Sequence, residues 1–362
     1  MSGGSRMHTE SLTVMVTSAG SKVAPMLVQC LKTCEEPLIR VVGVDASRKG
    51  AGSFFCDAFH SVPYGTNERY ANETLQIAVE ENVNVVIPGS DEEVLALSQA
   101  SAEFRRHGIV VACSSGETTE MALDKLTVLS FLKAKGIATA AFRGPRSLME
   151  LERDLHELRY PGQPVVFKPR RSRGRRGFWV VSREAERASL LMDNLRNYRI
   201  NADDLLHMLA NAEPFPEVML MEYLPGADFN VDLLAKDGEC LSIIPNERIE
   251  PEAGPVEVGL IREDRLVSEM ARQVAAAFRF DYLVNVEMAY PEDVKRGPLV
   301  YEINPRVSAP IAAYAAAGVN LLLMAVLLAA GCDVPRNQEV RETQMIRYSS
   351  DLYVQGDRTF RS

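Results

Sequence analysis

The sequence has few of the residues that build the commonest metal and redox centres. Its 362 residues include only six cysteines and five histidines. No two cysteines form a CxxC pair, so we expect small buried thiols in a reducing compartment, such as the cytoplasm, and no disulfide framework. The scattered histidines suggest neither a zinc cluster nor a Ser-His-Asp triad. The cysteines are Cys30, Cys34, Cys56, Cys113, Cys240 and Cys332.

Excess basic charge is absent too, as is an unbroken transmembrane run. The net charge of −9 argues against a general nucleic-acid binder. Residues 311–330 are almost uncharged and about long enough to cross a bilayer. However, Gly318 and Asn320 interrupt the run, and Asn320 suits the N-cap of a second helix. We therefore expect two short buried helices and no membrane partner. Residues 1–11 lack the apolar core of a signal peptide and are interpreted as a tag or disordered leader.

Strands and helices alternate after the leader. Residues 12–16 and 40–44 predict two strands joined by a helix over 23–33, which is a βαβ unit. The second strand ends in Asp45, where a dinucleotide-binding fold would hold a ribose. The first turn has the single glycine Gly20 in place of G-x-G-x-x-G, so NAD or FAD is disfavoured.

Acidic residues open a later helix, after a predicted buried strand. Ser90 or Asp91 suits its N-cap, and acids in a first turn are favourable to the helix dipole. Alternatively, Glu92 or Glu93 faces a substrate, because open α/β sheets bind ligands at the carboxyl ends of their strands. Lys125 lies near the start of another helix, where positive charge is unfavourable. Such local conflicts sometimes mark function.

A lysine and a basic, glycine-bearing loop lie between two further predicted strands. The strand over residues 164–169 carries Lys168 near its end, and the loop reads Arg-Arg-Ser-Arg-Gly-Arg-Arg-Gly over residues 170–177. Backbone N–H and guanidinium groups in such a loop suit a flap that closes over phosphates. The alternative is an RNA-binding arginine patch, but interleaved aromatic residues are lacking.

Residues 285–306 predict a hairpin with converging side chains. They read Asn-Val-Glu-Met-Ala-Tyr, a polar loop, and Leu-Val-Tyr-Glu-Ile-Asn-Pro-Arg. Side chains alternate along a strand, so Glu302 and Asn304 point the same way, and Glu287 joins them if the strands pair in register. Two carboxylates and one amide oxygen suit Mg²⁺. The alternative is an edge hairpin with ordinary surface acids.

Taken in this order, the segments resemble the ATP-grasp superfamily, in particular the synthetase units of the carbamoyl phosphate synthetase large subunit and its short stand-alone relatives. The resemblance implies an α/β and α+β fold. A Rossmann-like pre-ATP-grasp domain over residues 12–121 would precede a two-lobed ATP-grasp domain over 122–362. Its small lobe would cover about 140–224 and its C-terminal lobe about 225–362, with ATP between them. The segments that match are 14–20, 122–136, 165–181, 218–233, 285–288 and 300–306.

The resemblance implies ATP and Mg²⁺ (or Mn²⁺) as cofactors and assigns the nucleotide contacts. Lys125 and Lys168 resemble the two basic residues that touch the ATP phosphates. Asp228 stands where a ribose-binding glutamate is usual. The phosphate-covering loop would include Ser172, Arg173, Gly174 and Gly177, and the hinge that meets the adenine would be Glu222, Tyr223 and Leu224.

The metal ligands implied by the resemblance are Glu287, Glu302 and Asn304. Arg306 resembles the arginine that steadies the transferring phosphoryl group, so Arg306 and Lys168 are the expected catalytic residues.

The implied function is that of an ATP-dependent carboxylate–amine ligase. The γ-phosphoryl group of ATP would pass to a small carboxylic acid, with amino acids as one class, and an amine would displace phosphate from the acyl phosphate. ADP and phosphate would be released. One alternative is carbamoyl or carboxyphosphate synthesis, although the chain has one synthetase unit and no fused glutaminase. The other is a non-catalytic ATP-binding regulatory protein, against which the intact metal set argues.

Substrate identity is the part of the function that the sequence indicates least. Arg248 and Arg262, in a polar loop over residues 246–262, are candidates for binding a substrate carboxylate, with Glu92 as a third contact. Residues 345–354 predict a late strand that returns to the sheet, with Arg347 and Tyr348 near the site. A homodimer is common in such folds.

Overall fold

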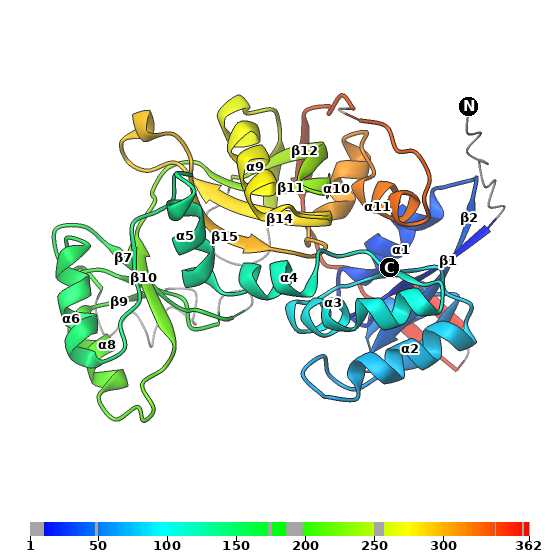
Figure 1. The fold of residues 1–362 in the computed structure, drawn as a ribbon, viewed down its shortest axis with the longest axis horizontal. Helices are drawn as coiled ribbons and strands as arrows, with labels where there is room; N and C mark the ends of the chain where they lie inside the picture. The colour runs from blue at the N-terminus through cyan, green and yellow to red at the C-terminus, as the bar shows by residue number, and fades with distance from the viewer. Residues whose placement is uncertain are drawn as a thin grey trace.

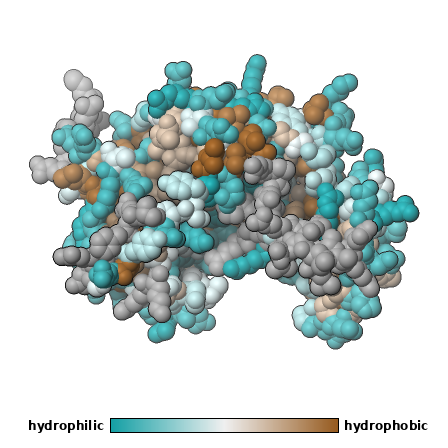
Figure 2. Space-filling view, turned by 180° about the vertical axis from the view of Figure 1, so that it is seen from behind, coloured by the Kyte–Doolittle hydropathy of each residue, from teal (hydrophilic) through white to brown (hydrophobic). Residues whose placement is uncertain are grey.

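The structure is a computed structural model that describes residues 11–47, 50–172, 176–185, 198–249, 257–336, 338–356 and 358–361. Three main sheets lie side by side in an arch (Figure 1). The largest sheet forms the middle of the arch, and a smaller sheet stands at either end. From behind, the surface is mostly hydrophilic and is hollowed between the two ends (Figure 2).

The first sheet is parallel and has the strand order β3-β2-β1-β4-β5. It confirms the predicted βαβ unit, because β1 and β2 pair in parallel on either side of the helix that joins them in sequence. Asp45 at the end of β2 accepts a hydrogen bond from the backbone of Gly20, so its carboxylate holds the turn after β1. The elements are β1 Ser11–Val16, α1 Ala24–Lys32, β2 Leu38–Asp45, η1 Ala51–Phe54, β3 Ala58–Ser61, α2 Tyr70–Glu80, β4 Val85–Ile87, α3 Asp91–Arg106 and β5 Val110–Val111.

The second sheet has the order β6-β10-β7-β8-β9 and is covered by two amphipathic helices. Two helices, α4 and α5, lead from the first sheet toward it. The elements are α4 Gly116–Ala122, α5 Lys125–Ala134, β6 Phe142–Arg143, α6 Leu148–Glu157, β7 Val165–Pro169, β8 Trp179–Val181, β9 Arg199–Ile200, α8 Ala202–Leu209 and β10 Val218–Glu222.

The third sheet is antiparallel, with the order β15-β14-β11-β12-β13-β16. Along β11, Phe229, Val231 and Leu233 face the apolar side of α9, whereas Asp228, Asn230 and Asp232 face the other way. The polar face of the sheet carries the site described below. The elements are β11 Asp228–Lys236, β12 Glu239–Arg248, β13 Val258–Ile261, α9 Arg265–Phe278, β14 Tyr282–Ala289, η2 Val294–Arg296, β15 Leu299–Asn304, α10 Ile311–Ala316, α11 Leu321–Ala329 and β16 Thr343–Ile346.

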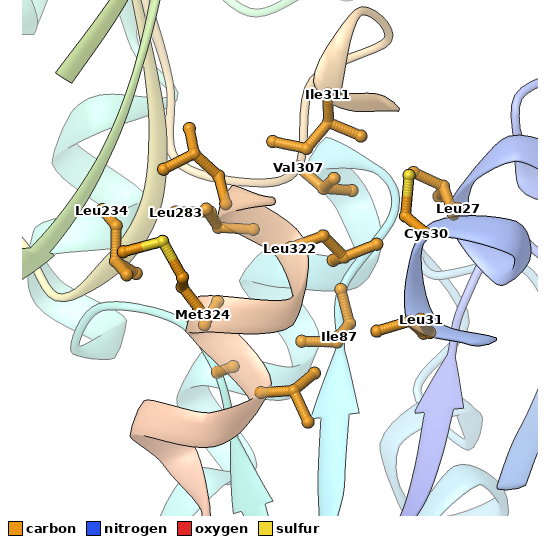
Figure 3. Packing of buried hydrophobic residues seen from close by; sticks show 14 of the residues in the cluster. Leu27, Cys30, Leu31, Ile87, Leu234, Leu283, Val307, Ile311, Leu322 and Met324 are labelled. Atoms are coloured by element: carbon orange, nitrogen blue, oxygen red, sulfur yellow. The ribbon is translucent and has the colours of Figure 1, made fainter. Parts of the chain in front are cut away.

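A shared hydrophobic core joins the first sheet to the third. Leu31 from α1 and Ile87 from β4 belong to the same buried cluster as Leu322 and Met324 from α11 (Figure 3). Leu234 from β11 lies in this cluster too. The parts of the chain that carry the site are therefore held together by packing.

The two short buried helices predicted over residues 311–330 are confirmed as α10 and α11. Asn320 caps α11, and its side chain accepts a hydrogen bond from the backbone of Leu323. In the described parts of the chain, no helix has both the length and the apolar character to span a membrane. The predicted limits of the leader and of the domains stay predictions, although β1 already begins at Ser11.

Two predictions from the sequence were wrong in detail. The polar stretch over residues 246–262 is not one loop, because β12 continues to Arg248 and β13 begins at Val258. In the tail, β16 does return to the third sheet, but β17 Leu352–Gln355 and β18 Arg358–Arg361 pair with each other in a separate sheet. Tyr348 is 84% exposed, so it does not pack near the site.

Candidate active site

Two neighbouring strands bring the predicted metal ligands to one face of the third sheet. Strands β14 and β15 pair antiparallel with Glu287 directly opposite Glu302, and Asn285 opposite Asn304. This register confirms the in-register pairing that Glu287 needs in order to share a face with Glu302 and Asn304. The Asn304 amide donates a hydrogen bond to Oε1 of Glu287 at 3.0 Å, which ties the two strands together at this point.

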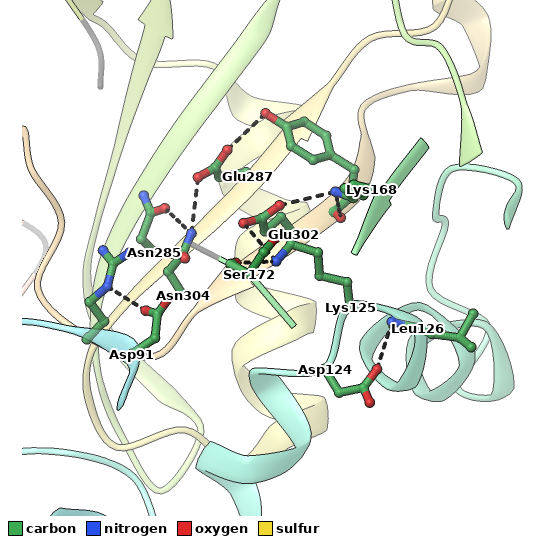
Figure 4. Close-up of polar contacts among 12 residues, drawn as sticks. Asp91, Asp124, Lys125, Leu126, Lys168, Ser172, Asn285, Glu287, Glu302 and Asn304 are labelled. Carbon is green, nitrogen blue, oxygen red and sulfur yellow. Dashed lines mark hydrogen bonds and ion pairs between the residues drawn. The ribbon is translucent and has the colours of Figure 1, made fainter. Parts of the chain in front are cut away.

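Two lysines from other parts of the fold converge on Glu302 (Figure 4). Lys168, from β7, places Nζ 3.1 Å from one Glu302 carboxylate oxygen. Lys125, the first residue of α5, places Nζ 3.6 Å from the other. The ammonium group of Lys125 also donates to the backbone oxygen of Ser172 at 2.7 Å. Both lysines are buried, so the third sheet, strand β7 and helix α5 meet at a single carboxylate.

The charge state of this cluster follows from burial and from proximity. Burial lowers the pKa of the Lys168 ammonium, and the nearby charge of Lys125 adds to the effect, while Glu302 opposes it. Burial tends to raise the pKa of Glu302, but the neighbouring Lys125 and Lys168 outweigh it and lower that pKa. One carboxylate therefore balances two buried ammonium groups, and this excess of positive charge suits the oxygens of a phosphate chain.

A second buried network lies next to Glu287. The guanidinium of Arg248 contacts Asp228 at 3.1 Å and Glu287 at 3.0 Å. The Tyr301 hydroxyl donates to the same two carboxylates, at 2.8 and 3.1 Å. Burial raises the pKa of Glu287, and the charges of Glu302 and Asp228 add to this, while Arg248 opposes it. Arg248 thus lies in the site as predicted, but its Nη atoms contact protein carboxylates.

The donor set fits a divalent cation. Glu287 and Glu302 are facing carboxylates on adjacent strands, and Asn304 supplies an amide oxygen two residues along β15 on the same face. Burial raises the pKa of Glu287, and the negative charge of the facing Glu302 adds to this, so a cation between the two carboxylates would stabilise their charged forms. Hard oxygen ligands of this kind suit Mg²⁺. Among the described residues, no three His, Cys, Asp or Glu side chains form a metal cluster, so the amide is needed as the third donor.

Arg306 follows β15 and contacts the start of helix α3. Its Nε donates to Oδ1 of Asp91, the first residue of α3, at 2.8 Å. Its Nη2 donates to the side-chain oxygen of Asn304 at 3.3 Å. The guanidinium therefore lies beside the predicted metal ligand Asn304, at the junction with the N-terminal part of the chain.

The predicted hinge begins at Glu222, the last residue of β10, and continues through Tyr223 and Leu224 toward β11. Both Glu222 carboxylate oxygens accept hydrogen bonds from Arg296, at 2.8 and 3.1 Å, and one also accepts from the backbone of Ala141 at 3.1 Å. These contacts hold the Glu222 side chain between β10 and β11, and its predicted contact with the adenine stays a prediction.

The remaining predicted residues lie apart from the central cluster or outside the described chain. Arg173 and Gly174 fall outside the described residues. Gly177 has a φ of +74°, which glycine adopts without strain. Arg262 pairs with Glu247 at 2.7 Å.

Glu92 follows Asp91 in the first turn of α3, where it is half-buried. It therefore lies near the Arg306 contact, and its predicted role in binding substrate stays a prediction.

Several contributing residues were missed by the sequence reasoning. Asp124 caps α5 and holds Arg170 at 2.6 Å, which places Lys125 at the helix start. An Asp before a helix is a recognisable N-cap signal, so this residue was accessible to sequence reasoning. Tyr301 and Arg296 had no local signal, because their partners come from distant strands.

Two family models match the sequence. The model described as "ATP-grasp in the biosynthetic pathway with Ter operon" matches residues 214–352, and "PylC-like, N-terminal domain" matches residues 14–112. The first range includes the three predicted metal ligands and Arg306. No curated protein matches the sequence.

Solved structures with the same fold come from several enzymes. An N5-carboxyaminoimidazole ribonucleotide synthetase with ADP is 15% identical, with a TM-score of 0.69 over 93% of this chain and 81% of that one. The biotin carboxylase domain of 2-oxoglutarate carboxylase from Hydrogenobacter thermophilus, with MgADP, ADP and bicarbonate, is 17% identical, with a TM-score of 0.67 over 91% and 72%. An L-amino acid ligase from Bacillus licheniformis is 15% identical, with a TM-score of 0.61 over 88% and 74%. These similarities confirm the predicted fold class.

Proposed function

We propose that the chain, whose residues 214–352 match an ATP-grasp model, is an ATP-dependent, ADP-forming ligase of that superfamily that joins a small carboxylic acid to an amine. The observation that carries this proposal is the convergence of Lys125 and Lys168 on Glu302, directly opposite Glu287. Four separate elements, α5, β7, β14 and β15, supply these groups, and a fold-only explanation would not require two buried ammonium groups at one carboxylate.

The two lysines would bind the phosphate chain of ATP. In the structure they share the single negative charge of Glu302, and phosphate oxygens would complete their charge-assisted hydrogen bonds. Mg²⁺, held by Glu287, Glu302 and Asn304, would neutralise charge on the phosphate oxygens. Arg248 keeps the neighbouring Asp228 and Glu287 paired, and Asp228 would meet the ribose.

Arg306 would act on the acceptor side of the transfer. A carboxylate oxygen of the acceptor attacks the γ-phosphorus, the bond from phosphorus to the β–γ bridging oxygen breaks, and ADP leaves. An amine then attacks the acyl carbon, the carbon–oxygen bond to phosphate breaks, and the amine proton passes to solvent. The positive charge of Arg306, beside Asn304, favours negative charge that develops on the transferring group.

The proposal is tested by product analysis. Purified protein, Mg·ATP and pooled amino acids with pooled amines should yield ADP and phosphate, and Glu302→Gln should release at least 100-fold less. Glu239→Gln is the matched control, because Glu239 forms an exposed pair with Arg336 away from the site. AMP and pyrophosphate as products, or full activity of Glu302→Gln, would overturn the proposal.

A second candidate is bicarbonate as the acceptor, which would give carboxyphosphate. The similarity to a biotin carboxylase domain solved with bicarbonate favours it. Release of ADP that depends on bicarbonate and not on amino acids would select this reaction. Tight ATP binding without ADP release, with any acceptor, would instead indicate a non-catalytic regulatory protein.

A further inference from the structure

The contact between Arg306 and Asp91 links two parts of the chain that are 215 residues apart. All three guanidinium nitrogens of Arg306 have partners. Nε donates to Asp91, Nη1 to the backbone oxygen of Val307 at 3.1 Å, and Nη2 to Asn304 at 3.3 Å. The Asp91 bond is the shortest of the three and the only one from the first sheet's side of the site. Without the bond to Asp91, the guanidinium of Arg306 would be held only by its near neighbours in sequence, Asn304 and Val307.

Asp91 is itself held in a fixed place. It opens α3, and the preceding Gly89 donates its backbone N–H to the hydroxyl of Thr17 at 2.9 Å. Two residues further on, Glu93 accepts a hydrogen bond from the same hydroxyl at 2.7 Å and another from the hydroxyl of Ser18 at 2.6 Å. A Cβ on Gly89 would lie 2.4 Å from the backbone oxygen of Thr17, so only glycine fits this approach. The helix start is thus locked onto the end of β1.

We propose that Asp91 is a positioning residue, which acts through Arg306 to aim its guanidinium at the acceptor and the transferring phosphoryl group. This inference rests on the proposed function. The side chains of Asp91 and Arg306 are 15% and 20% exposed, so the pair is shielded enough for its geometry to persist. A catalytic group displaced by about 1 Å can lose about 100-fold in rate, so orientation alone accounts for a large effect.

A purely structural role is the rival explanation. An acid in the first turn of a helix stabilises it through the dipole, and an ion pair between domains stabilises their docking. Either role would lower thermal stability when Asp91 is changed, but neither would lower kcat in folded protein. The kcat of folded Asp91→Asn protein therefore distinguishes the two explanations.

The kinetic test compares Asp91→Asn with Asp237→Asn, a matched Asp–Arg pair on the surface that joins Asp237 to Arg279. We expect Asp91→Asn to lower kcat at least 10-fold, with the Kd for Mg·ADP within twofold of wild type, while Asp237→Asn changes neither. The double variant Asp91→Asn with Arg306→Lys should have the same kcat as Arg306→Lys alone. Unchanged kcat in Asp91→Asn, or losses that multiply in the double variant, would overturn the proposal.

A second readout does not require turnover. In protein labelled with ¹⁵N-arginine, the Nε–H resonance of Arg306, assigned by its loss in Arg306→Lys, should be downfield-shifted and slow to exchange. Asp91→Asn should move it and speed its exchange, and an unchanged resonance would overturn the proposal. If wild type releases no ADP with any acceptor, the ligase function fails, and this resonance still decides whether Asp91 holds Arg306.

Discussion

Replacing Glu302 with glutamine separates nucleotide binding from turnover. The substitution keeps the size of the side chain but removes the one carboxylate that Lys125 and Lys168 share. Two buried ammonium groups are then left without their counter-charge. The folded protein should become less stable, and its affinity for an added anion should rise.

The magnitude follows from the burial of the groups. Breaking a buried ion pair by removing one partner costs about 3–5 kcal/mol. The Glu302 side chain is 16% exposed, and the pKa of Lys168 is already lowered, so part of the cost is relieved by deprotonation. We expect a loss of about 3 kcal/mol in the free energy of unfolding. We also expect metal-free ADP to bind about 10-fold tighter than in wild type, which corresponds to about 1.4 kcal/mol.

Calorimetric titration of ADP in EDTA, with chemical denaturation of the same samples, measures both effects. Glu239→Gln serves as the control, because its exposed pair with Arg336 should contribute little. Weaker binding of metal-free ADP by Glu302→Gln would refute the idea that Glu302 competes with phosphate for the two lysines. Unchanged stability would refute the idea that it neutralises them.

Three further substitutions test other parts of the account. Burial raises the pKa of Asp232 to about 6, so its contribution to stability is present below about pH 4 and is lost as the pH rises through 6. The free energy of unfolding of Asp232→Asn, relative to that of wild type, should therefore rise by up to about 3 kcal/mol between pH 4 and pH 7.5. Chemical denaturation that shows the same difference at both pH values would contradict this. Arg296→Ala frees the Glu222 carboxylate and should raise the KM for ATP up to about fivefold with kcat unchanged, so a change in kcat alone would count against the hinge role. Leu322→Ala, in the core that joins the first and third sheets, should lower the free energy of unfolding by about 2–5 kcal/mol, and a smaller loss would show that this core relaxes around the cavity.

The parts of the site that depend on local periodicity could be predicted from the sequence. Glu302 and Asn304 are two residues apart on a strand, so they share a face in any sheet. The break at Gly318 and Asn320 likewise has a local cause, because a glycine follows the end of α10 and an asparagine caps the start of α11.

The parts that depend on distant contacts could not be predicted. Asp91 suited an N-cap, and nothing near it in sequence indicates a bond to Arg306, which the packing of two sheets brings within reach. Arg248 was expected in a loop because its surroundings are polar, but pairing with β11 and β13 extends the strand through it. Tertiary pairing there overrides local composition.

The central claim is that a carboxylate receives the γ-phosphoryl group of ATP at the Glu302 site, and the transfer of a labelled oxygen tests it most directly. Wild-type protein is incubated with Mg·ATP, pooled amino acids whose carboxylates carry ¹⁸O, and pooled amines. If an acyl phosphate forms, each phosphate released should carry one ¹⁸O, since the carboxylate oxygen leaves with phosphorus when the amine attacks. Unlabelled phosphate would show that water, and not a carboxylate, takes the phosphoryl group, and would contradict the account.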